Sequence, residues 1–473
     1  MNCIAFTNPC ATDGETAWFA AMRSRLATLL TLAAPMVLAR ASQSVMTFAD
    51  VLQVKDLGEK SIAAVATGGL NAMTFVMLPT GMTFIVQSFV AQLVGRGDLK
   101  DTRRFAWYGL GFALLAGIAS AIAIPLVLPA LGLVSYPDDV RHLMASYIQI
   151  RLLSVFAAVG IEALGSWYGG LGNTWMAMFA GCITMVCAVV GNAILIPHFG
   201  VDGAAIACVI ATWLGFLFLV VAFWRGWGSA PKQHGPLGLS RRELWRVARF
   251  GLPNGLNWFF EFAAFDLFVN VVIAKLGSVT VAALNIVIAV NSLAFMPAFG
   301  LASAGSILAA QSIGAGDKDR VWSHVKLTLA CTIVWEGAMA VLYVLAPDRV
   351  FSLFAPSGGG ATLIATGAQM LMISALWQVF DAAGMTLNET LRAAGDTAWT
   401  STFRVAIAWA LFVPGSLVVV RVWHGGANGA MACLVGYLAV LAIALAARFK
   451  SGAWKRIQLL EPKVEAVLAG SAG

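Results

Sequence analysis

The chain has 473 residues, of which 60% are hydrophobic and only 11% are charged. Soluble globular domains carry about 25% charged residues, so the composition excludes a soluble fold and indicates a multi-span membrane protein. The formal net charge of +7 could suggest a nucleic-acid partner, but the positions of the basic residues, described below, argue against one.

Twelve apolar stretches are each long enough to cross a bilayer as a helix. The first 25 residues lack the charged start and apolar core of a signal peptide, so we expect the first span to direct its own insertion. The predicted spans cover residues 26–53, 61–94, 105–132, 140–170, 175–197, 202–224, 248–275, 279–312, 322–346, 362–393, 400–421 and 427–448.

The predicted fold is therefore an all-α polytopic membrane protein with twelve transmembrane helices in two pseudo-symmetric six-helix lobes. A connector rich in Gly, Pro and charge separates the halves. The predicted division is an N-terminal segment (1–25), an N-terminal lobe (26–224), a linker (225–247), a C-terminal lobe (248–448) and a tail (449–473).

The basic residues are distributed unequally between the two sides of these spans. With the N-terminus inside, 22 of the 30 Lys and Arg residues fall in inside segments and 6 in outside loops. By the positive-inside rule, both termini, the linker and the tail lie in the cytoplasm and the chain crosses the cell inner membrane. This explains the basic balance without nucleic acid.

Two motifs recur at an offset of 219 residues. LGEKSIAA begins at Leu57 and LGSVTVAA at Leu276, while AQLVGRGD begins at Ala91 and AQSIGAGD at Ala310. An even number of spans separates the copies, so both halves insert in the same orientation, related by a pseudo-twofold axis along the membrane normal. Transporters use such repeats to rock one half against the other around a central site.

Acidic residues within the spans are the main functional candidates, because an ionised side chain near the bilayer centre costs about 2.5–3.5 kcal/mol on insertion scales. Burial favours the protonated carboxyl group, which can then exchange a proton or bind a cation. Arg40 and Arg151 are candidate partners for buried acids, and Asp266 and Glu336 could be salt-bridge partners. The candidate acids are Asp50, Glu162, Glu261, Asp266, Glu336, Asp381 and Glu389.

Two of these acids have an aromatic residue on their own helical face. Trp258 precedes Glu261 by three positions, and Trp377 precedes Asp381 by four. An acid beside an indole can attract an organic cation by charge and π-face together. The alternative is that both tryptophans only pack, and that Asp50 is an acid at the water boundary.

Signs of catalysis or of a metal site are weak. The five histidines fall at loops or span ends, and none of the seven cysteines forms a C-x-x-C pair. The GRGD and GAGD turns follow no strand and precede no Lys-Ser/Thr, so they are not phosphate-binding loops. We therefore expect no enzyme, no metal centre and no cofactor apart from a coupling ion.

The chain resembles the multidrug and toxic compound extrusion (MATE) family, in particular its NorM-type bacterial branch, over about residues 26–450. The resemblance rests on both AQxxGxGD turns, GLPNGLNWFFEF at 251–262 and the segment from Asp381 through LRAAGDT. It implies V-shaped lobes that alternate between outward-open and inward-open states.

The resemblance also implies roles for three acids. Asp50 is the acid of the N-terminal lobe, implicated in proton coupling and drug release, and Glu261 and Asp381 are the cation-binding acids of the C-terminal lobe. Trp377 stands where this branch often has a tyrosine, which removes an oxygen ligand for Na⁺. After Asn192, Ile196 occupies a position that is acidic in some other branches, so this lobe relies more heavily on Asp50.

The leading hypothesis is thus a secondary antiporter, functional as a monomer in the lipid bilayer. It exports hydrophobic or cationic small molecules in exchange for inward H⁺ or Na⁺, with Na⁺ placed at Glu261 and Asp381 if it is the coupling ion. The alternatives are a lipid-linked precursor flippase of the same superfamily and an intramembrane transferase.

Overall fold

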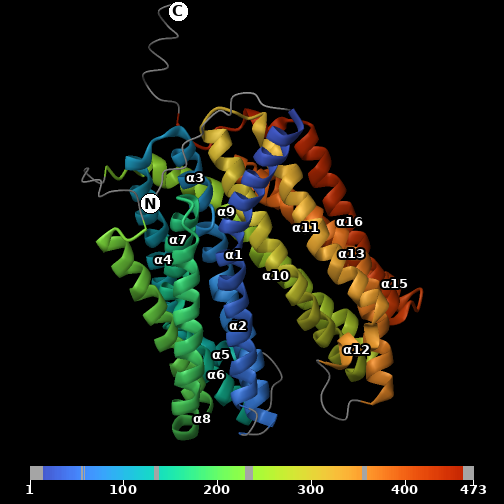
Figure 1. Ribbon diagram of the computed structural model, residues 1–473. Helices are drawn as coiled ribbons and strands as arrows, with labels where there is room; N and C mark the ends of the chain where they lie inside the picture. The colour runs from blue at the N-terminus through green and yellow to red at the C-terminus, as the bar shows by residue number, and fades with distance from the viewer. Residues whose placement is uncertain are drawn as a thin grey trace, which may run out of the picture.

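The computed structural model describes residues 14–54, 57, 59–132, 138–228, 238–353 and 360–461, and within these ranges it contains helices and no β-strand. The helices pack side by side in an elongated bundle (Figure 1). The α-helices are α1 (Gly14–Val54), α2 (Glu59–Thr83), α3 (Val86–Arg96), α4 (Thr102–Ala123), α5 (Val127–Leu131), α6 (Asp138–Leu152), α7 (Val155–Gly170), α8 (Trp175–Arg225), α9 (Arg241–Leu267), α10 (Ser278–Gly314), α11 (Arg320–Leu345), α12 (Pro347–Ser352), α13 (Ala361–Ala394), α14 (Thr397–Ile407), α15 (Val413–Arg421) and α16 (Gly426–Lys450). Two π-helical segments, η4 (Phe268–Val272) and η6 (Ala408–Phe412), extend α9 and join α14 to α15.

These helices form the twelve predicted spans, some of them broken. Nine described helices are long and apolar enough to cross a membrane, or ten if the bent pair Val140–Leu152 and Val155–Gly170 is one span. The 51-residue α8 comprises two spans, because Gly200 adopts non-helical angles (φ 57°, ψ −130°) three residues after Pro197. Together with α1 this gives twelve, which confirms the predicted fold class.

Helix edges differ most from the prediction where the chain leaves the linker. Helix α9 begins at Arg241, inside the stretch assigned to the linker. The Tyr108 hydroxyl of α4 accepts a hydrogen bond from the Ser240 N–H at 2.7 Å and donates one to the Glu243 carboxylate at 3.0 Å. The first turn of α9 is thereby fixed against α4.

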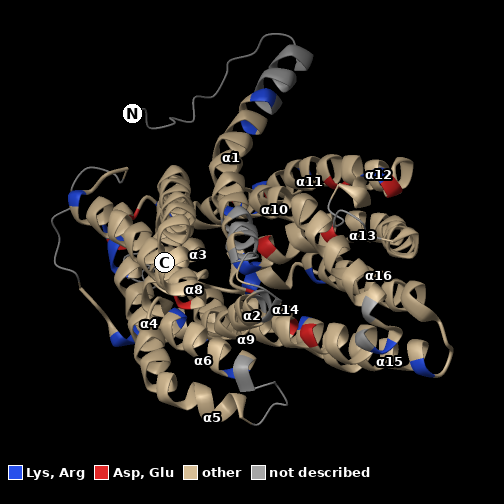
Figure 2. Ribbon diagram, turned by 90° about the horizontal axis from the view of Figure 1, so that it is seen from below, with Lys and Arg blue, Asp and Glu red and all other residues tan. Residues whose placement is uncertain are grey.

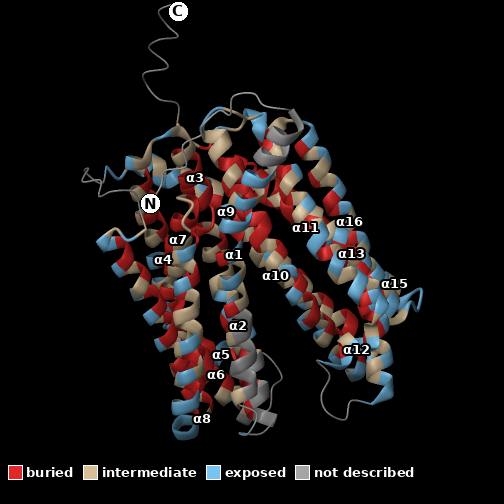
Figure 3. Cartoon of the chain, in the orientation of Figure 1, coloured by how far each residue is buried: buried red, intermediate tan, exposed pale blue. Residues whose placement is uncertain are grey.

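The two lobes have separate cores and meet at one end of the bundle. One large apolar core lies within residues 264–454, and another is built mainly from residues 85–223. Figure 1 shows the lobes converging at the end where the C-terminus lies and diverging toward the other. Buried residues continue across the junction at the first of these (Figure 3). We call this the closed end and the opposite one the open end.

Glycines of the repeated motif let the two lobes touch backbone to backbone at the closed end. A Cβ atom at Gly95 in α3 would overlap the carbonyl group of Gln311 in α10, and a Cβ atom at Gly314 would overlap that of Gln92. Position 95 plus 219 is 314, and 92 plus 219 is 311, so the two contacts are copies of each other. Small residues allow such close approach of membrane helices.

The same pairing recurs further along the interface. A Cβ atom at Gly81 in α2 would lie 2.7 Å from the Gly255 Cα of α9, and one at Gly300 in α10 would lie 2.6 Å from a Val37 methyl group of α1. Residues 81 and 300 are again 219 positions apart. The sequence repeat therefore corresponds to a pseudo-twofold relation between the lobe contacts.

Replacing Gly95 by alanine should destabilise the closed end, because the new methyl group meets a carbonyl that belongs to another helix backbone. We expect a loss of about 1–3 kcal/mol, as for overpacked cores, measured as a lower melting temperature of the purified protein in detergent. The matched control is Gly111→Ala in α4, where nothing lies within 4 Å of the added Cβ. Equal melting temperatures for the two variants would contradict the close contact.

Candidate functional site

Few charged residues lie along the helices (Figure 2). The predicted acids do not form one centre. Glu261 lies in α9 and Asp381 in α13, both in the C-terminal lobe, whereas Asp50 lies in α1 of the N-terminal lobe. The side chain of Asp50 is outside the described residues, so its predicted role stays a prediction.

Glu261 is held by an arginine and a tyrosine from two other helices. Arg404 of α14 donates to both carboxylate oxygens of Glu261, at 2.6 and 2.8 Å. The Tyr437 hydroxyl of α16 donates to Oε1 at 3.1 Å, and Asn257 donates to Oε2 at 3.3 Å from one turn earlier in α9. This carboxylate therefore has a complete set of donors and a compensating positive charge.

Arg404 and Tyr437 are functional residues that the sequence reasoning missed, since Arg404 was counted with the basic residues of an inside loop. It lies seven positions after Thr397, the first residue of α14, which places it roughly 10 Å along the helix. The π-helical segment η6 begins four residues after it, and such segments frequently occur at functional sites. An arginine two turns inside an apolar span could have been recognised as a partner for a buried acid.

Asp381 and Glu336 form the second acidic group of this lobe. Asp381 is within electrostatic range of Arg404 and Glu261, and it stays partly exposed. Glu336 of α11 is within electrostatic range of Asp381 and fully buried, with 0% of its surface exposed. Neither of its carboxyl oxygens has a hydrogen-bond partner among the described residues, so it does not form the salt bridge considered for it above.

The two tryptophans predicted beside the acids are placed differently. Trp258 packs on Phe84 across the lobe interface, with ring centroids 5.7 Å apart. Trp377 is buried in the core of the C-terminal lobe. Their predicted part in substrate binding stays a prediction.

In the N-terminal lobe, Arg40 is the partner of a buried acid, as predicted. Its guanidinium lies 3.2 Å from the Glu162 carboxylate of α7 and 5.2 Å from the ring centre of Phe299 in the other lobe. Asn192 is fully buried in α8. It follows Gly191, which packs against Ala207 of the next span, so Asn192 lies where the two halves of α8 meet.

A fully buried arginine joins the two lobes near the closed end. Arg392 of α13 forms a 2.5 Å ion pair with Glu389 one turn earlier. It also donates to the Phe84 carbonyl at 3.1 Å and to the Ser88 hydroxyl at 3.2 Å, both from the N-terminal lobe. The carbonyl of Phe84 is accessible because the chain breaks between α2 and α3 at this point. We call these four residues the interlobe latch.

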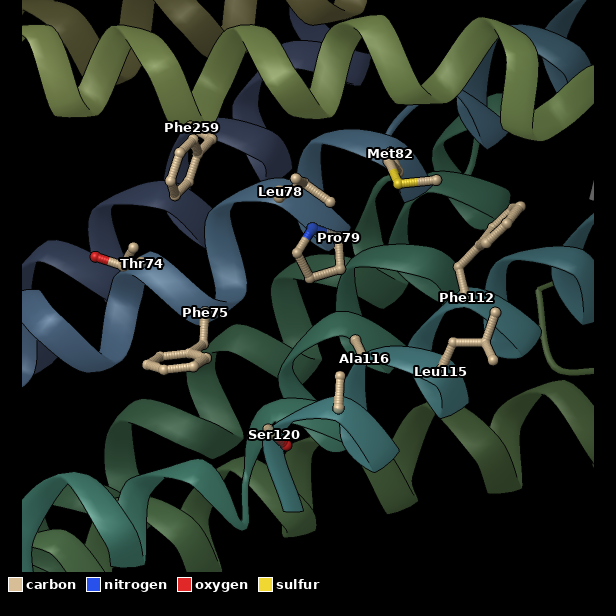
Figure 4. A pocket seen from close by; sticks show the side chains of 11 residues that line it. Thr74, Phe75, Leu78, Pro79, Met82, Phe112, Leu115, Ala116, Ser120 and Phe259 are labelled. Atoms are coloured by element: carbon tan, nitrogen blue, oxygen red, sulfur yellow. The ribbon is translucent and has the colours of Figure 1, made fainter. Parts of the chain in front are cut away.

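An apolar cavity of about 480 Å³ lies beside the lobe interface. Figure 4 shows side chains of α2 and α4 around it, with Phe259 of α9 reaching in from the other lobe. Phe259 is two residues before Glu261, and successive helix positions face different directions, so the cavity and the acids lie on different sides of α9. Its size falls in the range of about 300–1,000 Å³ found for small-molecule sites.

Within the described ranges, no group of three or more His, Cys, Asp or Glu side chains could hold a metal ion. In the C-terminal lobe, Arg404 stands among the acids instead. The arrangement can therefore hold charge and exchange protons between carboxyl groups.

Comparison with known proteins gives one family and many relatives. The MatE family model matches residues 35–194 and 259–416, one match in each lobe. The chain is 26% identical over 431 residues to the probable multidrug resistance protein NorM of Neisseria meningitidis serogroup B, covering 88% of this chain and 92% of that protein. It is 26% identical over 402 residues to the multidrug resistance protein PmpM of Pseudomonas aeruginosa, covering 83% of each.

Solved structures share the fold. One, described as a crystal structure of MATE in complex with MaL6, has a TM-score of 0.83 at 22% identity and covers 92% of this chain and 98% of that one. Another, described as the outward-facing conformation of a multidrug resistance MATE family transporter, has a TM-score of 0.82 at 21% identity, covering 92% and 97%. These likenesses agree with the two-lobed arrangement.

Replacing Arg404 by glutamine should destabilise the protein, because Glu261 then keeps its charge without a partner. The pair is partly exposed, with side-chain exposures of 16% and 31%, so we expect a loss of about 2 kcal/mol rather than the 3–5 of a fully buried pair. Chemical denaturation in detergent measures it. Adding Glu261→Gln to the Arg404→Gln variant should restore most of the loss, and a double variant less stable than both single variants would contradict the pairing.

Proposed function

Since this chain belongs to the MatE family of multi-span membrane transporters, we propose that it is a secondary antiporter that exports hydrophobic and cationic small molecules in exchange for inward H⁺ or Na⁺. It performs no covalent chemistry. It works as a monomer in the inner membrane with both termini in the cytoplasm.

The observation that carries the proposal is a pair of acids, Asp381 and Glu336, deep in the spans of one lobe. Asp381 precedes the last residue of α13 by 13 positions, roughly 20 Å along the helix, and Glu336 follows the first residue of α11 by 16 positions, roughly 24 Å. A carboxyl group at this depth is costly when ionised, so it tends to mark an ion pathway or proton relay.

The interlobe contacts supply the second requirement of an antiporter, two alternative states. At the closed end, the interlobe latch and the backbone contacts at Gly95 and Gly314 seal the lobes together. With both termini in the cytoplasm, the closed end is the cytoplasmic one and the chain is outward-open. Rocking the lobes about their pseudo-twofold axis would break these contacts and open the cytoplasmic side.

The substrate class follows from the cavity beside the interface and from the relatives. The cavity is lined by apolar and aromatic side chains, with Thr74 and Ser120 as its hydroxyl groups. A site of this kind accepts molecules by size and hydrophobicity more than by hydrogen bonding. It therefore suits the chemically varied compounds that the word multidrug implies for NorM and PmpM.

Cells that express the protein should accumulate less of a fluorescent organic cation such as ethidium than cells without it, and a protonophore or removal of sodium should abolish the difference. The readout is intracellular fluorescence. Efflux that persists when both ion gradients are collapsed but stops on ATP depletion would contradict secondary transport.

Asp381→Asn should insert normally and lose gradient-driven efflux, since the amide keeps the shape and cannot ionise. Asp50→Asn should behave in the same way if the N-terminal lobe also carries protons. Ser292→Ala serves as a control, because its exposed hydroxyl donates only to the backbone of its own helix. Full efflux by the Asp381→Asn variant would remove Asp381 from the coupling site.

A further inference from the structure

Glu336 is a buried acid with neither a charged nor a hydrogen-bonding partner. Its exposure is 0%, and both carboxyl oxygens lack a hydrogen bond among the described residues. Transfer of an unpaired carboxylate from water into such surroundings costs so much free energy that the group takes up a proton or a cation instead. The structure therefore requires an occupant for this carboxyl group that the protein itself does not provide.

The packing of α11 on α13 fixes which group lies opposite Glu336. The hydroxyls of Thr332 in α11 and Thr386 in α13 are 3.2 Å apart. One helical turn further along α11 comes Glu336, and because the two helices are antiparallel, one turn back along α13 comes Ala382. The carboxyl group of Glu336 accordingly faces the backbone of Ala382, beside Asp381.

The other groups around Glu336 do not neutralise it. Helix α10, which also packs on α11, contains no charged residue over its full length. Tyr343, within electrostatic range of Glu336 on α11, donates its hydroxyl to the Val290 carbonyl at 3.2 Å. The positive charge nearest to Asp381 is Arg404, which binds both oxygens of Glu261.

Counting charge over the four residues shows what the lobe lacks. Arg404 and Glu261 compensate each other, which leaves the carboxyl groups of Asp381 and Glu336 without a counter-charge from the protein. Two neighbouring carboxyl groups in one site do not ionise together readily, because each disfavours the charge of the other. At least one of them is therefore protonated whenever the site is shielded from water.

We propose, on the basis of the antiport function above, that Glu336 and Asp381 form a proton-binding carboxyl pair and that Glu336 carries a transported proton of its own. Asp381 is partly exposed and exchanges protons with water, while Glu336 receives its proton through Asp381. The coupling ion of this lobe is then H⁺, and Glu261 is a positioning residue that holds Arg404 beside Asp381.

The test compares the number of protons exchanged per substrate in proteoliposomes loaded with ethidium. A pH gradient is opposed to the ethidium gradient until net flux stops, and the balance point gives the ratio. Glu336→Gln should export with one proton fewer per substrate than the unmodified protein. The control Asp266→Asn, an exposed acid of the same lobe bonded to Asn270 at 3.0 Å, should keep the original ratio. An unchanged ratio in Glu336→Gln would overturn the proposal.

A second measurement covers the case in which Glu336→Gln does not transport. Infrared difference spectra of the purified protein between acid and alkaline pH should contain the carbonyl stretch of a protonated carboxylic acid, and Glu336→Gln should lose part of that band. Identical bands in both proteins would overturn the proposal. Failure of the unmodified protein to respond to a pH gradient would instead refute the antiport function, while the infrared comparison would still decide whether Glu336 binds a proton.

Discussion

Charge inside a membrane has to be balanced within a few ångströms, because the hydrocarbon layer supplies no water to solvate it. Glu162 meets this constraint with Arg40, Glu389 with Arg392, and Glu261 with Arg404. Each of these pairs carries its own compensation and can persist through a transport cycle. Asp381 and Glu336 lack one, so the same constraint that makes the paired acids structural makes this pair an exchange site.

The constraint also explains why the two lobes join as they do. The polar groups at the junction are satisfied across it, since Gln92 donates to the Ala393 carbonyl at 2.7 Å and Asn254 to that of Gly81 at 2.6 Å. Such bonds require the backbones to approach closely, and glycine permits this. Because the contacts occur as two copies, the lobes turn as rigid bodies about a common axis instead of deforming.

Much of this architecture could be predicted from sequence, because it depends on local and periodic signals. Apolar length gave the spans, and the offset of 219 residues gave the lobes. The site was less predictable. Asp381 and Glu261 stand in recognisable motifs, but the pairing of Glu261 with Arg404 joins positions 143 residues apart. Likewise, Trp258 was assigned to Glu261 by helical spacing, yet its ring contacts Phe84 on another helix. Partners chosen by tertiary packing leave no periodic trace in the chain.

The interlobe latch has a consequence for how the closed end opens. Arg392 is 1% exposed and Glu389 is 3% exposed, and in the closed state the Phe84 carbonyl and the Ser88 hydroxyl serve the arginine in place of water. When the lobes part, those oxygens are withdrawn and the guanidinium must be rehydrated from the cytoplasm. Opening is thus a wetting step that consumes bulk water, so its equilibrium depends on water activity and on the osmotic strength of the solution on that side.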